Sequence, residues 1–296
     1  MTQTNPIIEL RDVSFSYGEG ARAALDHVSL SISEGDFVGV IGPSGAGKST
    51  LAAVMSGAIP HHFTGQLYGA TLIDGKDTCE VTLTDISRIV GSVLQDIDAQ
   101  MVASVVEDEM LFGLENFGVP HDQIEERISQ TLATVGISDL REREIATLSG
   151  GQKQKVAIAA ILALAPRVLV LDEPTAGLDP EERMRFRTLI ATLGADRTVI
   201  LSTHILDDVA QTCPYVCVLR SGRLRYDGAT AGLIDGAHGR TWLTPPLMAP
   251  PTGAVVVNAA TTTQGTRYRI VSAAPPVGSQ PVEPTLEDGY MALAAR

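Results

Sequence analysis

The chain has 296 residues, of which 44% are hydrophobic and 19% charged, and its 35 acidic and 22 basic side chains give a net charge of −13. This composition excludes global disorder, because the apolar content is sufficient for a core. The acidic balance argues against a nucleic-acid partner, since such proteins normally carry a basic stripe. The polar start, 1–5, predicts no secretion signal, and the apolar run 156–165 is shorter than the roughly 20 residues that span a bilayer.

The first part of the chain alternates short apolar strands with turns. Strands are predicted over 7–17, 25–32 and 37–41, where β-forming residues are bounded by Gly and Asp. The third strand leads into a glycine-rich loop, and a helix is predicted over 49–56. This strand, loop and helix order is the setting of a phosphate-binding loop.

The central part is predicted to be helical, and the sheet resumes after it. Residues 122–135 repeat apolar side chains at helical spacing, and 156–164 is apolar all round, which is typical of a buried helix. The runs 168–171 and 198–201 are continuous apolar strands, as in a parallel sheet covered on both faces. Residues 216–226 are predicted to form a hairpin.

The three cysteines cannot form a complete disulfide framework. Cys213 and Cys217 are close enough in the sequence to be two metal ligands, but two ligands do not complete a zinc site. We favour buried, small apolar side chains at both positions, in a soluble protein of a reducing compartment.

The composition changes after about residue 236. Proline pairs separate short strand-like runs at 254–257 and 267–271. Thr285 is expected to cap a last short helix that ends at Leu293. We therefore expect residues 238–296 to form a small accessory unit.

The glycine-rich loop has the residues that bind nucleotide phosphates. Its glycines allow successive amides to face one anion, and the following helix presents its positive N-terminus to that anion. Lys48 can reach the β- and γ-phosphates, and the Ser49 hydroxyl suits Mg²⁺. The loop consists of Gly42, Pro43, Ser44, Gly45, Ala46, Gly47, Lys48, Ser49 and Thr50.

Two carboxylates follow the apolar run 168–171. Asp172 stands at the end of the predicted strand, where it is expected to hold Mg²⁺ directly or through water. Glu173 comes next and is expected to polarise the attacking water. A solvated acidic turn is the alternative, but Pro174 and the segment 176–179 that follow resemble a loop of a known nucleotide-binding family and favour the functional interpretation.

Five motifs in a fixed order resemble the ATP-binding cassette (ABC) ATPase family. They are the phosphate loop, Gln95, the signature Leu148-Ser149-Gly150-Gly151-Gln152, Asp172-Glu173-Pro174, and His204. The resemblance implies an α/β fold with a RecA-like P-loop NTPase core, an antiparallel β edge and a helical insert. The expected nucleotide-binding domain covers 1–237, with its helical subdomain at about 96–165, and 238–296 becomes a small C-terminal α+β unit. The implied activity is ATP hydrolysis with Mg²⁺.

The resemblance also implies roles for single residues. Tyr17, 31 positions before Lys48, would stack on adenine, and Asp179 belongs to the loop after the carboxylate pair. The signature is expected to open the apolar helix, where a serine hydroxyl and two glycine amides form a second anion site. The resemblance implies that this site covers the ATP held by the opposite subunit, so a head-to-tail homodimer or heterodimer is expected. The catalytic set is Lys48, Gln95, Glu173 and His204; the metal set is Ser49, Gln95 and Asp172; and the nucleotide-binding set is the phosphate loop with Tyr17, Ser149, Gly150, Gly151, Gln152 and Asp179.

A transporter role is favoured among the functions that this family serves. Repair and chromosome-organising members insert long coiled coils between the two glycine motifs, whereas Lys48 and Ser149 are only 101 positions apart (149 − 48) with no heptad run between them. Translation factors carry two cassettes and basic linkers, and this chain is acidic with one cassette. Since no membrane span is expected, separate integral-membrane subunits would form the channel. The chain would then lie at the cytoplasmic face of the cell membrane.

The subtype resemblance changes along the chain. Residues 1–179, above all 56–65, 95–120 and 149–179, are similar to energy-coupling factor (ECF) importer ATPases. Residues 180–296 are more similar to ATPases of drug- and peptide-export systems. Micronutrient import is the first interpretation, because the segment after Gln95 faces the membrane partner in this family. Export is the alternative, and an ATPase acting on a soluble assembly is a further one.

Overall fold

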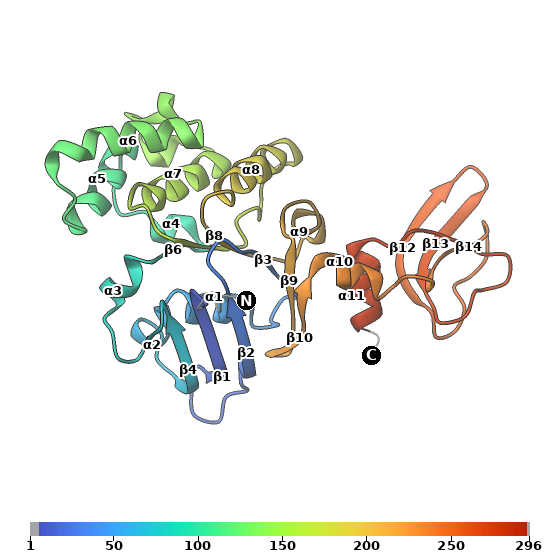
Figure 1. Ribbon diagram of the computed structural model, residues 1–296. Helices are drawn as coiled ribbons and strands as arrows, with labels where there is room; N and C mark the ends of the chain where they lie inside the picture. Colours follow the sequence, from blue (N-terminus) through green and yellow to red (C-terminus); the bar gives the residue numbers. More distant parts are fainter. Residues whose placement is uncertain (1–5, 295–296) are drawn as a thin grey trace.

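A computed structural model describes residues 6–294 and contains three sheets (Figure 1). The first is antiparallel, and in its β2 strand the buried Val28, Leu30 and Ile32 alternate with exposed serines, as the sequence predicts. Gly69 allows a close approach within this sheet, because a Cβ there would lie 2.4 Å from the Asp12 carbonyl oxygen. The strand order is β2-β1-β4-β5, with β1 at Ile8–Ser16, β2 at Leu25–Ile32, β4 at Gln66–Ile73 and β5 at Lys76–Asp77.

The second sheet has six strands in the order β10-β9-β3-β8-β7-β6. Every residue of β3, β7 and β8 is buried, which explains why these strands are continuous apolar runs without alternation. All neighbouring pairs are parallel except β9 with β10, the predicted hairpin. The bounds are β3 at Phe37–Ile41, β6 at Val90–Val93, β7 at Val168–Asp172, β8 at Thr198–Thr203, β9 at Tyr215–Arg220 and β10 at Arg223–Ala229.

The parallel register places the carboxyl ends of three strands together. Ile41 pairs with Thr203, and Asp172 pairs with Ser202. The loops that follow β3, β7 and β8 therefore leave the sheet at one edge, where open α/β sheets bind ligands.

The helices occupy most of the chain between β6 and β7, and they gather with α8 at one end of the molecule (Figure 1). In α6 the buried residues are Ile124, Ile128, Leu132 and Val135, the predicted apolar stripe. One continuous apolar cluster joins these helices to the sheet. The helices are α1 at Lys48–Met55, α2 at Ala58–His61, α3 at Leu83–Ser87, α4 at Ile97–Gln100, α5 at Val106–Asn116, α6 at His121–Val135, α7 at Gly150–Ala163, α8 at Pro180–Leu193, α9 at Leu206–Thr212, α10 at Thr230–Asp235 and α11 at Leu286–Ala294, with 3₁₀ turns η1 at Ser138–Leu140 and η2 at Ile145–Thr147.

The third sheet lies beyond α10 and α11 (Figure 1). Its order is β12-β13-β11-β14, with β11 at Thr241–Leu243, β12 at Val255–Thr262, β13 at Gly265–Val271 and β14 at Gln280–Pro281. The helix α11 packs against α10, and Leu286 belongs to the main apolar cluster. The domain boundary after residue 237 therefore stays a prediction.

The predicted cap of the last helix has a different geometry from the expected one. The side chain of Thr285 donates a 2.8 Å hydrogen bond to Asp288 Oδ2, and the Thr285 amide donates to the same oxygen at 2.6 Å. Asp288 is fully buried and also binds Arg269. The capping group is therefore the carboxylate of Asp288.

Two sequence expectations concern burial and membrane crossing. Cys213 and Cys217 are both buried, as expected, and burial raises the pKa of the Cys213 thiol to about 12. Within residues 6–294, none of the helices has the length and apolar character needed to cross a bilayer.

Candidate active site

The phosphate loop connects β3 to α1 at the edge where the parallel strands end. Glycine is required at two of its positions by close backbone approach: a Cβ at Gly42 would lie 2.2 Å from the Leu219 carbonyl oxygen, and one at Gly47 would lie 2.3 Å from that of Ala24. Gly47 is also the N-cap of α1, with φ 105°, and provides no side-chain cap. The first amides of α1 therefore have no competing side-chain acceptor at the cap and can face an anion.

Lys48 is the first residue of α1, and its ammonium group is buried. Its Nζ lies 3.2 Å from the Gly42 carbonyl oxygen and 3.1 Å from Glu173 Oε1. The Glu173 carboxylate is buried to the same degree. A buried charge is tolerated when it is paired, so the two loops are joined by an ion pair.

Glu173 adopts a backbone conformation that is unusual for its residue type. Its φ is +51°, in the left-handed region that costs energy for a residue with a Cβ. Its amide donates to the Ser202 carbonyl oxygen at 2.8 Å, and its own carbonyl oxygen accepts from Ala176 N at 3.0 Å. This turn directs the carboxylate toward Lys48 and His204.

His204 follows β8 and contacts the other oxygen of Glu173. Its Nδ1 lies 2.7 Å from Glu173 Oε2, and its amide donates to the same oxygen at 3.3 Å. Because a carboxylate only accepts hydrogen bonds, Nδ1 carries the proton in this contact. The chain Lys48–Glu173–His204 thus holds one carboxylate between an ammonium and an imidazole.

Asp172 has the properties of a magnesium ligand. It ends β7 and is buried, yet its Oδ1 has no hydrogen-bond partner, and the Ser202 hydroxyl on the neighbouring strand also has none. An unpaired buried carboxylate oxygen calls for a cation or water. Mg²⁺ is commonly bound by one or two carboxylates together with phosphate and water, so Asp172 fits this ion. The role of Ser49, which is exposed on α1, as a second ligand stays a prediction.

Gln95 lies just after β6, the edge strand of the second sheet. Its side chain is exposed, and it lines a cleft of 520 Å³ together with Glu173, Gly150 and Gly177. The structure therefore brings Gln95 to the same cleft as Glu173.

The ring of Tyr17, which is half exposed, lies edge-on to Phe15 and Phe63, and its hydroxyl is 3.1 Å from Thr50 Oγ1 on α1.

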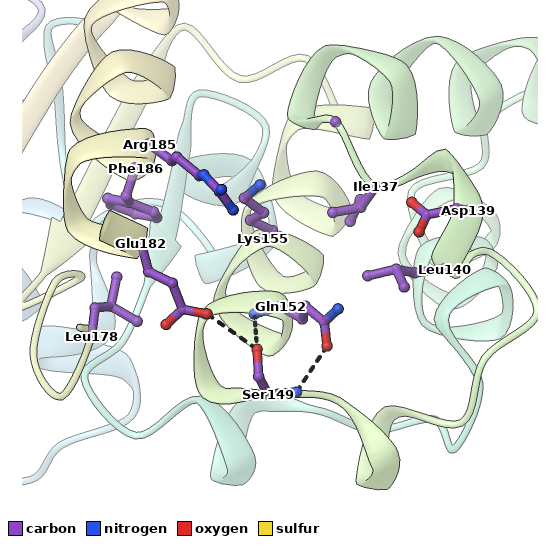
Figure 2. A pocket seen from close by; sticks show the side chains of 12 residues that line it. Ile137, Asp139, Leu140, Ser149, Gln152, Lys155, Leu178, Glu182, Arg185 and Phe186 are labelled. Carbon is purple, nitrogen blue, oxygen red and sulfur yellow. Dashed lines mark hydrogen bonds between the residues drawn. The ribbon is translucent and has the colours of Figure 1, made fainter. Parts of the chain in front are cut away.

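The signature forms the N-terminus of α7 (Figure 2). Ser149 is the N-cap: its hydroxyl accepts from Gln152 N at 3.2 Å, and its own amide donates to Gln152 Oε1 at 2.9 Å. This reciprocal capping box engages the side chain of Gln152 within the helix end. Across residues 6–294, no hydrogen bond or ion pair joins Ser149, Gly150 or Gly151 to the phosphate loop.

Glu182 of α8 lies against the signature, which the sequence did not indicate. Ser149 Oγ is 3.4 Å from Glu182 Oε1 (Figure 2). A Cβ at Gly151 would lie 2.8 Å from the same carboxylate. Asp179, expected at the nucleotide, caps α8 by accepting from the Glu182 amide at 2.8 Å. The cavity beside these residues measures 190 Å³.

Thr175 and Asp208 were also not predicted from the sequence. Both are buried, and the Thr175 hydroxyl donates to Asp208 Oδ2 at 2.7 Å. Neither position carries a recognisable motif by itself. Their places, two residues after Glu173 and four after His204, are the only signal in the sequence.

Comparisons with known proteins agree with this geometry. A family profile described as ABC transporter matches residues 25–176. The energy-coupling factor transporter ATP-binding protein EcfA1 of Enterococcus faecalis is 43% identical over 226 residues, which cover 75% of this chain and 79% of that protein. EcfA of Methanothermobacter thermautotrophicus is 40% identical over 235 residues, 78% of this chain and 74% of that protein.

A solved structure shares the fold. CbiO1 from Clostridium perfringens, described as part of the ABC transporter complex CbiONQ, matches with a TM-score of 0.68 and 32% identity, over 76% of this chain and 89% of that one. The 235-residue match to EcfA is longer than 1–179, so similarity to an ECF ATPase continues past Asp179. The exporter-like resemblance of 180–296 stays a prediction.

Proposed function

The chain belongs to the ABC transporter ATP-binding family and is an ATP-binding ATPase, and on this premise we propose that it powers solute import through separate membrane subunits. Two copies, or one copy and a second ABC ATPase, sandwich two ATP molecules head to tail. The assembly lies at the cytoplasmic face of the cell membrane. The chain of contacts Lys48–Glu173–His204 is the observation that carries the catalytic part of this proposal.

Different residues of this chain have different roles in ATP hydrolysis. Lys48 binds the β- and γ-phosphates in place of its contact with Glu173, and the amides of the phosphate loop surround the same oxygens. Glu173, once released from Lys48, accepts the proton of the attacking water, and His204 holds that carboxylate in position through Nδ1. Asp172, Ser49 and Gln95 would hold Mg²⁺, which neutralises charge on the phosphates when bound.

The proposed dimer accounts for the signature at the tip of α7. A helix N-terminus with two glycines and a serine hydroxyl is a second anion site, but one protomer already has its phosphate loop. In the part of the chain that the structure describes, no hydrogen bond or ion pair joins the tip to that loop. The triphosphate held by a partner chain supplies the missing anion.

Import is favoured over export by the ECF relatives and by the segment 95–120, which we propose contacts the membrane partner. Co-purification of a small solute-binding membrane subunit supports import. Two exporter permease chains in the same preparation would replace it with the export alternative. A chain that does not sediment with membranes would instead indicate an ATPase of a soluble assembly.

The dimer and the role of Glu173 are tested together with a Glu173→Gln variant. We expect it to bind ATP, to hydrolyse it very slowly, and to elute as a dimer in ATP but as a monomer without nucleotide. Normal turnover by this variant would remove Glu173 from its role. Slow turnover without any dimer would leave that role in place but contradict the sandwich.

A further inference from the structure

The loops that carry Glu173 and His204 are joined a second time, outside the chain of contacts in the active site. Thr175 lies two residues after Glu173, and Asp208 lies four residues after His204, in α9. The hydroxyl of Thr175 donates to Asp208 Oδ2 at 2.7 Å, and the two residues are 1% and 0% exposed. This hydrogen bond therefore connects the segment after β7 to the segment after β8 in the interior.

Burying the carboxylate of Asp208 costs free energy. Its Oδ1 has no hydrogen-bond partner but forms an ion pair of 3.6 Å with Arg187 NH1 of α8. A buried carboxylate with incomplete pairing is destabilising compared with an apolar side chain of similar size. Stability alone is thus a poor reason for an aspartate here, and a hydrogen bond of defined geometry is a better one.

The backbone around both residues is fixed. Asp208 N donates to the Ile205 carbonyl oxygen at 3.2 Å, and the Thr212 hydroxyl donates to the Asp208 carbonyl oxygen at 2.6 Å. On the other side, Thr175 lies inside the turn closed by Ala176 N and the Glu173 carbonyl oxygen. That turn holds Glu173 at its unfavourable φ of +51°.

We propose that Asp208 is a positioning residue for the ATPase reaction. Through Thr175 it holds the turn that carries Glu173 at a fixed place relative to the segment that carries His204, so that the 2.7 Å contact between Glu173 and His204 forms in the correct orientation. This inference rests on the proposed role of Glu173. Asp208 touches neither Lys48 nor the phosphate loop, so nucleotide binding does not depend on it.

A Thr175→Val variant tests the link, because it removes the hydroxyl and keeps the shape of the side chain. We expect kcat for ATP to fall about tenfold while KM changes by less than about twofold, which is the signature of a lost transition-state interaction. Thr175→Ser keeps the hydroxyl and should restore kcat to within about twofold of the wild type. If the valine variant does not fold, Thr175→Ala gives the same test.

Thr212→Val is the matched control. Its hydroxyl lies on α9 and binds the main chain of Asp208, but it does not join the two loops. We expect it to lower thermal stability while leaving kcat within about twofold of the wild type. A combined Thr175→Val and Asp208→Leu variant should lose less than about twofold more than the worse single variant, because each change removes one partner of the same hydrogen bond.

Three results overturn the inference: wild-type kcat in Thr175→Val, a raised KM with unchanged kcat, or an equal loss of kcat in Thr212→Val. The outcome is distinct from that of the proposed function. Wild-type protein without ATPase activity would contradict the proposed function itself. Active wild-type protein with an equally active Thr175→Val variant would remove only the positioning role of Asp208.

Discussion

Lys48 and Glu173 form an ion pair of 3.1 Å in which each side chain is less than a tenth exposed. The cation that should bind the triphosphate and the carboxylate that should activate water are thus each other's partners. We expect nucleotide binding to separate them, because the phosphates would compete for the same ammonium group. We therefore expect the carboxylate to be freed when nucleotide binds.

Glu173→Gln should destabilise the nucleotide-free protein, because it leaves the buried Lys48 ammonium without a counter-charge. We expect a loss of about 3–5 kcal/mol in the free energy of unfolding. Saturating Mg-ADP should remove most of this loss, since its phosphates pair with Lys48. Denaturant unfolding with and without Mg-ADP measures both values. The control Glu181→Gln breaks an exposed pair with Arg185 and should cost little in either condition.

Lys48→Ala should abolish nucleotide binding, because the loop loses its one buried cation for the phosphates. A fluorescent ATP analogue measures the affinity directly. In this variant Glu173 loses its ion pair with Lys48 and keeps its contact with His204. Circular dichroism therefore has to show that the variant is folded. Unchanged affinity in a folded variant would contradict the assignment of Lys48.

Alanine at either signature glycine should be tolerated within the protomer. At Gly151 a Cβ would lie 2.8 Å from the Glu182 carboxylate, which is the end of a flexible side chain and can shift, and Gly150 has open space around it. Gly150→Ala should leave the thermal midpoint unchanged or raised, as alanine favours a helix. If a partner's nucleotide contacts this tip, Gly150→Ala nevertheless lowers ATPase activity. Full activity in Gly150→Ala would count against the head-to-tail sandwich.

The helical region contains a pH-dependent link. Arg141 binds Glu125 through two hydrogen bonds of 2.7 and 2.6 Å, which lower the pKa of Glu125 from 4.5 to about 2. A lowered pKa in the folded state means that this contact stabilises the fold above pH 4.5 and that its contribution is lost as the pH falls toward 2. Glu125→Gln should therefore lower the thermal midpoint at neutral pH, with the difference from wild type narrowing on acidification.

The neighbouring Glu126→Gln serves as the control for that measurement. Glu126 lies on the same helix, and its contact is a hydrogen bond from Gln130 with no cation. Its replacement should have little effect at any pH. An equally large, pH-dependent effect in this control would show that the helix responds to net charge and not to the Arg141 contact.

The strands and the loops that carry the site were largely predictable. The bounds of β2 and β3 agree with the sequence-based strands at 25–32 and 37–41, because turns and apolar patterns mark both ends. The signature was expected to open the apolar helix, and α7 does begin at Gly150, although two glycines are poor helix formers. Ser149 and Gln152 form the capping box that begins this helix.

Asp207 and Asp208 show why the rest of the site could not be predicted. They are identical adjacent residues, yet Asp207 is exposed and Asp208 is fully buried against Thr175. The distinction depends on which face of α9 meets α8 and the loop after β7. That is decided by tertiary packing, which no local pattern encodes. The position of Glu182 beside the signature could not be predicted for the same reason.

The place of Leu286 in the main apolar cluster has a consequence for how the protein is made. Leu286 is 245 positions after Ile41 (286 − 41), and both belong to that cluster. During translation the residues around Ile41 emerge from the ribosome long before α11 does. The main apolar cluster therefore lacks Leu286 for most of synthesis. We expect a nascent chain halted before residue 286 to be more sensitive to protease, and to engage chaperones more strongly, than one halted after α11.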